Sequence, residues 1–378
     1  MAVLTEEQSM LRDAAREWVR EKAPVAAFRK VRDTSAPLGY DPAAFAEMAQ
    51  MGWAGVVIPE AYGGSEFGYL SLGLVLEEMG KTLTASPILA SALAAASALA
   101  MGGSEAQKTE WLPKIASGEA VATLAVDEGP RHDPLHTALK AEKTAAGYTL
   151  TGAKTHVLEG MAADLYILAA RTSGKSGEAG GITLFLVPSG AKGLTRKKRA
   201  LADARGYAAL TLDGVELGVG AVLGEADGGH ELLEKTLDRA RAGLAAEMLG
   251  MSVQAFETTL DYLKTRVQFG QTIGSFQALQ HRAAKMFSEL ELTRSCVEAA
   301  LTAIDNDAPD TAQAVALAKA HAGDTLHLIS REMVQMHGGI GMTDAHDAGL
   351  YMKRARALEA TYGSTAWHRD RWGRMAGY

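Results

Sequence analysis

The strongest constraint on the fold is that the spacing of apolar residues changes twice along the chain. It is helical up to about residue 120, breaks into short β-rich runs between Gly, Ser and Lys turns, and returns to helical after residue 229. We therefore predict an α+β chain in three consecutive domains. These are an N-terminal α-helical domain (1–120), a middle antiparallel β-domain (121–229) and a C-terminal four-helix bundle (230–378).

Local signals place helices in the first domain. Thr5 and Gln8 have the spacing of a capping box, and Pro24 should end the helix that follows. Asp41 and Pro42 predict the start of a second helix, which Gly52 should end. A third helix is expected over 71–80, after a turn at 59–64.

The middle and last domains show contrasting patterns. The runs 147–152, 164–170 and 182–188 are typical of strands. Beyond them, long amphipathic segments with short breaks predict an antiparallel four-helix bundle. These helical segments cover 230–265, 276–305, 311–337 and 343–372.

Composition argues against some functions and locations. The 378 residues are 47% hydrophobic and 22% charged, which is ordinary for a globular protein, and the net charge of -7 argues against general nucleic-acid binding. The local basic run at 192–199 is more often a solvated turn than a binding patch. One cysteine, Cys296, and no apolar segment long enough for a membrane span favour a cytoplasmic protein.

Four motifs occur in an order that resembles the acyl-CoA dehydrogenase family. The segment 52–64 resembles the N-terminal signature of that family, and 147–154 resembles its G-x-x-L-x-G-x-K hairpin. Residues 266–270 with Gln277 look like its R-x-Q-F-G segment, and 335–341 look like its Q-x-x-G-G-x-G loop. The resemblance covers the whole chain. It implies a flavoprotein that uses FAD to desaturate an acyl-CoA, with electron-transfer flavoprotein as electron acceptor.

The two C-terminal motifs imply contacts to the ADP half of FAD in a neighbouring subunit. The planar guanidinium group of an arginine can form two parallel hydrogen bonds to a pyrophosphate. Glycines allow the backbone to approach an anion closely. In the alternative reading, Arg266 pairs with a local carboxylate and Phe269 is part of the core. The resemblance favours cofactor binding by Arg266, Phe269, Gln277, Gln335, Gly338 and Gly339. We predict no metal ligand.

The positions that would hold the flavin ring depart from the family pattern. The family has W-[IV]-[ST] after the lysine of its hairpin, whereas this chain has His156, Val157 and Leu158. Upstream, Val126 stands where the family has a hydroxyl side chain. By the standards of the family, the flavin pocket of this chain is degraded.

Both positions that the family uses for its catalytic base lack a carboxylate. The reaction needs a base for the α-proton of the thioester. Tyr362 stands at the glutamate of Y-E-G-T, and a tyrosine, with a reference pKa of ~10, is almost fully protonated at neutral pH. Ala240 occupies the second position, before Arg241. Asp238 lies about 200° around the helix from Ala240 and should point elsewhere.

Other titratable residues are candidates for a replacement base. His156 and His337 titrate in a suitable range, but a single histidine in a hairpin or at a helix end is far more often structural. Glu359 lies one helical turn before Tyr362 and more often forms a surface or interface pair. None of these is a preferred base.

The pattern predicts a subunit that has lost its own flavin-ring pocket and catalytic base. It keeps the residues that would contact the FAD of a neighbouring subunit. It resembles the non-catalytic subunit of heterotetrameric (α2β2) acyl-CoA dehydrogenases that act on steroid side chains and other bulky acyl-CoAs. Its partner would be a second acyl-CoA dehydrogenase chain. Two alternatives stay open: a homotetrameric enzyme with a relocated base, and a binding protein that holds acyl-CoA or FAD without turnover.

Overall fold

A computed structural model describes residues 4–378, which form two compact units of non-contiguous segments. Unit 1 comprises Met1–Arg29, Tyr69–Thr84 and Arg241–Tyr378, and unit 2 comprises Lys30–Gly68 and Ala85–Ala240. Helix α7 (Gly229–Thr265) begins in unit 2 and ends in unit 1. The helical ends and the sheet-rich middle confirm the predicted fold class, while the three domain boundaries stay a prediction.

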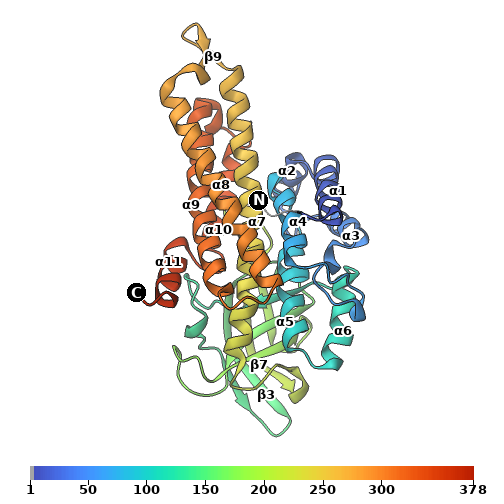
Figure 1. Cartoon of the computed structure of the whole chain (residues 1–378). Helices are drawn as coiled ribbons and strands as arrows, with labels where there is room; N and C mark the ends of the chain where they lie inside the picture. Colours follow the sequence, from blue (N-terminus) through green and yellow to red (C-terminus); the bar gives the residue numbers. More distant parts are fainter. Residues whose placement is uncertain (1–3) are drawn as a thin grey trace. The chain divides into compact units, whose positions relative to one another are not determined.

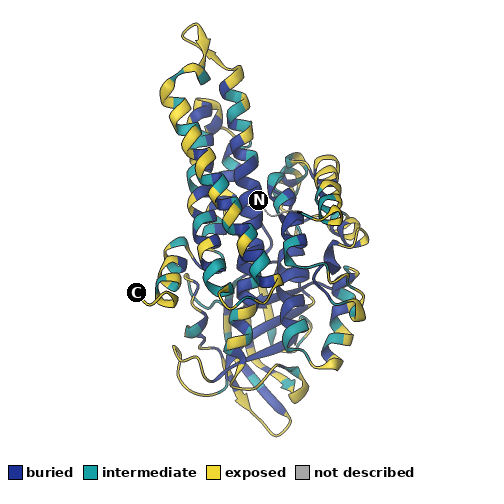
Figure 2. Ribbon diagram, viewed as in Figure 1, coloured by how far each residue is buried: buried dark blue, intermediate teal, exposed yellow. Residues whose placement is uncertain are grey.

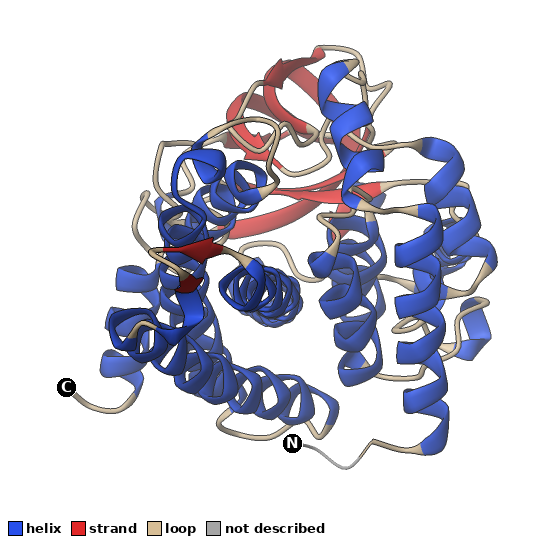
Figure 3. Cartoon of the chain, turned by 90° about the horizontal axis from the view of Figure 1, so that it is seen from above, coloured by secondary structure: helices blue, strands red, loops and turns tan. Residues whose placement is uncertain are grey.

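Unit 1 consists of helices except for one small hairpin (Figures 1 and 3). The hairpin, made of β9 (Val267–Gln268) and β10 (Gln271–Thr272), connects α7 to the next long helix. The other elements are α1 (Glu6–Lys22), α4 (Tyr69–Lys81), η6 (Ile273–Ser275), α8 (Gln277–Asp305), α9 (Thr311–His337), η7 (Gly338–Met342), α10 (Ala348–Ala360) and α11 (Thr365–Met375). Helix α2 (Val25–Asp33) crosses from unit 1 into unit 2.

The predicted helix starts are confirmed in atomic detail. The Thr5 amide donates to Gln8 Oε1 at 3.1 Å, and the Gln8 amide donates to Thr5 Oγ1 at 3.2 Å, which completes the capping box. In unit 2, Asp41 accepts from the Ala43 amide at 3.0 Å at the start of α3 (Pro42–Gln50). These bonds satisfy amides that the first helical turn leaves free.

The fourth segment of the predicted bundle is not one helix. The expected helix over 343–372 is divided into α10 and α11 by a turn at 361–364. Tyr362 and Gly363 have φ angles of 54° and 111°, which end α10, and Ser364 caps α11 by accepting from the Trp367 amide at 3.2 Å. Left-handed backbone stops a helix whatever its amphipathic pattern.

Unit 2 contains the sheet and several short helices. These are α3, η1 (Trp53–Gly55), η2 (Glu60–Tyr62), the π-helix η3 (Ile88–Ala95), α5 (Ala96–Gly102), α6 (Glu105–Ala116), η4 (Pro134–His136) and η5 (Val219–Ala221). The strands are β1 (Ala122–Ala125), β2 (Lys140–Lys143), β3 (Gly147–Val157), β4 (Leu165–Arg171), β5 (Ile182–Pro188), β6 (Leu194–Arg199), β7 (Tyr207–Gly218) and β8 (Val222–Leu223).

The sheet runs in the order β6-β7-β3-β2-β4-β5-β8, with β1 paired to β4. Most pairs are antiparallel, as expected, but β1–β4 and β2–β4 are parallel. Strand β4 is buried along its whole length, and Figure 2 shows that much of the sheet region is buried. Tyr148 meets Phe185 there edge to face, with ring centroids 5.0 Å apart. Burial of both faces explains why β4 reads as a continuous apolar run.

The basic run belongs to a strand rather than to a turn. Residues 194–199 form β6, an exposed edge strand paired with β7, so the predicted solvated turn at 192–199 is wrong for most of that range. Solvent exposure, however, is as expected. Lysine and arginine on an edge strand oppose pairing with other chains.

Two features are absent from the part of the chain that the structure describes. Within residues 4–378, no helix is long and apolar enough to cross a membrane. Over the same residues, no group of three or more His, Cys, Asp or Glu side chains is placed to hold a metal ion.

Candidate functional site

The R-x-Q-F-G segment forms the tight turn of the hairpin at the end of α7. The Arg266 amide donates to Tyr262 O, and Arg266 O accepts from the Ile273 amide, both at 2.8 Å. Phe269 and Gly270 have φ angles of 53° and 80°, and two successive positive φ angles suit a two-residue hairpin. The turn holds the Phe269 ring 92% exposed, so the alternative in which Phe269 is core does not apply to this chain by itself.

The Q-x-x-G-G-x-G loop follows α9 and is open to ligands. Gly338 has φ 64° and ψ -139°, a conformation that is essentially restricted to glycine. No heavy atom of the described chain lies within 4 Å of a Cβ built at Gly338 or Gly339. The backbone here is therefore free to approach an anionic group closely.

Aromatic stacking joins the hairpin to the glycine loop. Tyr262, four residues before Arg266, stacks on His337 with ring centroids 4.4 Å apart, and His337 directly precedes Gly338. The two motifs consequently share one end of unit 1 (Figure 1). The predicted cofactor residues are all exposed there, and we call them the bundle-end set: Arg266, Phe269, Gln277, Gln335, Gly338 and Gly339.

Tyr362, which matches the glutamate of the family's Y-E-G-T motif, lies in the turn between α10 and α11. Tyr362 is buried, and its carbonyl oxygen accepts from Arg241 Nε and from His368 Nε2, each at 3.1 Å. Arg241 also stacks over the Trp367 ring, 4.7 Å from its centroid. Because a carbonyl can only accept, Nε2 carries the proton of His368, and burial lowers the pKa of this histidine far below its ordinary value.

A buried lysine supports the same turn from α9. Lys319 Nζ donates to Leu358 O at 3.0 Å and to Gly363 O at 3.2 Å. Burial, reinforced by the nearby Arg241 charge, lowers the pKa of Lys319 to about 7, while Glu359 opposes the shift. Its position within the apolar stripe of α9 is the sequence signal that could have identified it.

The second base position and the flavin-ring positions belong to unit 2. Ala240 is fully buried and Asp238 is nearly so, on the part of α7 that belongs to this unit. Val126 and Leu158 are buried hydrocarbon side chains. His156 is half-buried with a φ of 54° at an irregularity in β3, where pairing with β7 is interrupted.

The lysine of the hairpin motif forms internal hydrogen bonds. Lys154 Nζ donates to Val126 O at 2.9 Å and to Glu128 Oε1 at 2.7 Å. Complete burial lowers the pKa of Lys154, and the Glu128 charge opposes that shift. Beside this pair, His132 Nδ1 lies 2.8 Å from Asp127 Oδ1. These contacts fix the loop that precedes β2.

The remaining base candidates have structural partners. His337 Nδ1 donates to Met333 O at 2.7 Å, and burial lowers the pKa of His337. Glu359 accepts from Arg356 at 2.5 Å and lies 2.9 Å from His327 Nδ1, which confirms the predicted ion pair. Glu359 thus links α10 to α9, whereas the bond of His337 lies within α9.

Comparisons with known proteins agree with the motifs. Family models of the acyl-CoA dehydrogenase N-terminal, middle and C-terminal domains match residues 5–119, 127–216 and 227–376. The probable acyl-CoA dehydrogenase YngJ of Bacillus subtilis is 30% identical over 368 residues, which cover 96% of each chain. The chain belongs to the acyl-CoA dehydrogenase family.

Solved acyl-CoA dehydrogenase structures share the whole fold. A variant of the Tcur3481-Tcur3483 steroid ACAD superimposes with a TM-score of 0.89 at 30% identity, covering 98% of both chains. The ChsE4-ChsE5 complex from Mycobacterium tuberculosis gives a TM-score of 0.89 at 27% identity and covers both chains completely. The chain is therefore an oxidoreductase of a family that dehydrogenates acyl-CoA, with FAD as cofactor.

The two halves of FAD fit this acyl-CoA dehydrogenase differently. The exposed Arg266 and the open backbone at Gly338 and Gly339 suit an anionic pyrophosphate. In unit 2, Val126 and Leu158 offer no hydroxyl to a flavin ring. The bundle-end set fits the cofactor, whereas these unit 2 positions do not provide the contacts that the family pattern implies.

Proposed function

We propose that this chain is the non-catalytic subunit of a heterotetrameric acyl-CoA dehydrogenase. Its bundle-end set would bind the FAD of a second acyl-CoA dehydrogenase chain, and that partner would supply the base and the flavin-ring pocket. Electron-transfer flavoprotein would be the acceptor of the complex. The observation that carries the proposal is the exposed bundle-end set on a chain that has no carboxylate at either base position.

The chemistry explains why the two base positions matter. FAD, when bound, would supply the acceptor for a hydride from the β-carbon of the acyl group, and a nearby base would have to remove the α-proton. Tyr362 presents a phenol where the family has a carboxylate, and Ala240 presents a methyl group. Asp238 lies two residues from Ala240, about 200° around the helix. Nothing at these positions can take the α-proton as a carboxylate does.

The bundle-end set supports a role toward another chain. Arg266 offers a planar fork that pairs with phosphate oxygens through two parallel bonds. The glycine loop next to it can present amides without side-chain obstruction. Paired names among the structural neighbours, Tcur3481-Tcur3483 and the ChsE4-ChsE5 complex, support a partner of the same family.

The first test is the FAD content of this chain purified alone and after co-expression with the acyl-CoA dehydrogenase encoded beside it. We expect little FAD alone and about one FAD per pair of unlike chains in the complex. About one FAD per chain in the single-chain preparation would favour a homotetramer with a relocated base. A complex that does not form, or that lacks turnover with every acyl-CoA tried, would favour a binding protein.

Arg266→Ala tests directly whether Arg266 binds the FAD of the proposed partner chain. Losing a charge-assisted pair should weaken FAD binding to the complex about 10- to 100-fold, as measured by titration of the apo complex. Lys264→Ala is the matched control, because Lys264 is an exposed cation two residues away at the same end. Equal effects of the two substitutions would indicate a general charge effect and contradict the assigned contact.

A further inference from the structure

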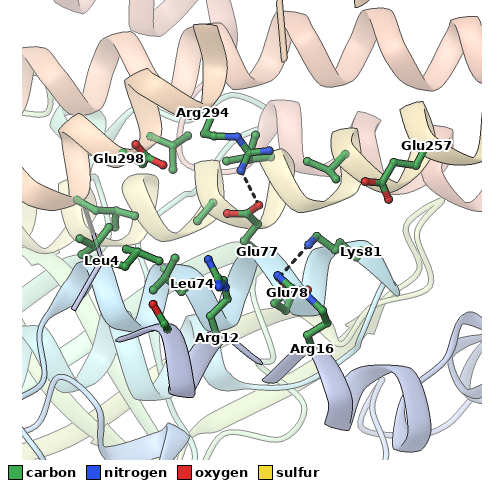
Figure 4. Close-up of a pocket in the computed structure, with 18 residues that line it drawn as sticks. Leu4, Arg12, Arg16, Leu74, Glu77, Glu78, Lys81, Glu257, Arg294 and Glu298 are labelled. Carbon is green, nitrogen blue, oxygen red and sulfur yellow. Dashed lines mark hydrogen bonds and ion pairs between the residues drawn. The ribbon is translucent and has the colours of Figure 1, made fainter. Parts of the chain in front are cut away.

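Unit 1 contains a cavity of about 450 Å³ bordered by α1, α4, α7 and α8 (Figure 4). This volume lies in the range of ~300–1,000 Å³ that is typical of small-molecule sites. Aliphatic side chains form much of its wall, among them Leu74, Leu249, Val253 and Leu301. Around them the cavity carries arginine, lysine and glutamate side chains.

Two consecutive glutamates on α4 hold the neighbouring helices around the cavity. Glu77 accepts from Arg294 on α8 at 3.0 Å, and Glu78 accepts from Arg16 on α1 at 3.1 Å. Successive residues point about 100° apart on a helix, so the two carboxylates reach different neighbours. Both glutamates line the cavity, and Figure 4 labels them among its lining residues.

The Glu78 carboxylate is incompletely paired. Its side chain is 2% exposed, and Oε1 accepts from both Arg16 and Lys81, the latter at 2.8 Å. The other oxygen, Oε2, is buried and has no hydrogen-bond partner among the described residues. A buried acceptor without a donor costs free energy, which a bound donor would recover. Glu78 is one of the residues that line the cavity, so a turn of its carboxylate would bring Oε2 to a donor on a ligand there.

The cavity is separate from the side of α7 that carries the family's second base position. Leu249 follows Ala240 by nine residues, which places it about 180° around a straight helix. Ala246 and Val253, also in the cavity wall, lie within about 60° of Leu249. Occupation of this cavity is therefore a property additional to the proposed cofactor role.

We infer that this cavity binds a neutral hydroxylated aliphatic or alicyclic molecule whose hydroxyl donates to Glu78 Oε2. A hydroxyl supplies the missing donor without bringing a charge. An ammonium group would add a third cation next to Arg16 and Lys81. A carboxylate would place an acceptor against an acceptor. The apolar body would lie against the aliphatic wall.

Two ligands of equal size test this assignment on the full-length protein. Octan-1-ol can donate to Glu78, whereas 1-methoxyheptane has the same number of heavy atoms and no donor. Titration calorimetry should give at least tenfold tighter binding of the alcohol, since a bond to a charged acceptor commonly contributes that much. Equal affinities would overturn the proposal, and so would the absence of binding by either ligand.

Two variants locate the site and the acceptor. Glu78→Gln keeps one acceptor oxygen for Arg16 and Lys81 and replaces the other with an amide donor, so the preference for the alcohol should disappear. Val253→Trp should fill the cavity and abolish binding of both ligands. Binding that persists unchanged in the tryptophan variant would place the ligand elsewhere. The comparison of the two ligands on the unaltered protein remains decisive if a variant fails to fold.

Discussion

Lys319 shows how one buried lysine makes the stability of the chain depend on pH. Its lowered pKa of about 7 lies below the 10.5 of an exposed lysine, chiefly because burial disfavours the charged form. Between these pH values the unfolded chain binds a proton that the folded chain releases. The free energy of unfolding therefore rises with pH from about 7 toward 10.5. The neutral amine retains the N–H groups it needs for Leu358 O and Gly363 O.

Lys319→Met should remove this pH dependence. One pKa unit corresponds to about 1.4 kcal/mol, so the unaltered chain should gain roughly 1–2 kcal/mol relative to the variant between pH 7.5 and 9.0. Urea unfolding curves of both proteins at the two pH values provide the measurement. A difference in stability that does not change with pH would show that Lys319 is charged throughout.

Residues of this kind are hard to predict because their partners are main-chain atoms. Lys319 donates to carbonyls that follow it by 39 and 44 residues. Every residue has a main-chain carbonyl, so the sequence does not show which of them a lysine will contact. Tyr362 and Ala240 were predicted from motifs that give their register, whereas Glu78 in the cavity belongs to no motif.

At the scale of elements, α4 and α7 approach so closely that only glycine fits at their crossing. A Cβ at Gly250 would lie 1.8 Å from Glu77 O, and a Cβ at Gly80 would lie 2.2 Å from Glu247 O. Both obstacles are backbone atoms, which cannot move aside as a side chain can. The crossing fixes α4, and with α4 the two glutamates that border the cavity.

Gly250→Ala should destabilise the chain by about 1–3 kcal/mol, the usual cost of overpacking, although alanine favours a helix. Gly373→Ala is the control, because no described heavy atom lies within 4 Å of its Cβ and it also belongs to a helix. That change should be neutral or stabilising by up to about 1 kcal/mol. Thermal unfolding of both variants would test this, and equal melting temperatures would contradict the close crossing.

The start of a helix was predictable where a side chain caps it. The Thr5 capping box and the Asp41 cap lie in the sequence three and two residues from their partner amides. The division of the last helix was missed because amphipathic spacing continues across the turn. Gly363 and Ser364 were nevertheless visible there as a helix stop followed by a cap.

At the scale of the whole molecule, exposed apolar side chains gather at the end of the bundle. Val267, Phe269, Ile340 and Met342 are 53%, 92%, 48% and 76% exposed. They belong to the hairpin and the glycine loop, which the stack of Tyr262 on His337 joins. Exposed apolar groups around a polar binding set are typical of a surface that another protein covers.

The double substitution of Phe269→Ser and Met342→Ser should weaken association with the proposed partner chain at least tenfold. Each side chain is largely exposed, so the free energy of unfolding of this chain alone should change by less than about 0.5 kcal/mol. Sedimentation of the mixed chains would measure association. Met10→Ser is the control, since Met10 is 66% exposed on α1. Unchanged association in the double variant would exclude this end as the interface.

The order of helical and β-rich regions was predictable over the whole chain, but the grouping into two units was not. Unit 1 joins residues from both ends of the sequence through contacts such as Arg29 Nε to Asp347 Oδ1, 2.8 Å apart and 318 residues apart in sequence. Periodicity reports which face of an element is buried, not which distant element buries it.

The turn at Tyr362 has a consequence for how such a chain can change over generations. Arg241 and His368 hold the carbonyl oxygen of Tyr362, and Lys319 holds that of Gly363, so these bonds do not depend on which side chain stands at position 362. After gene duplication, one copy could exchange a catalytic carboxylate for a phenol without losing these supports. The scaffold would persist while the chemistry passed to its sister copy.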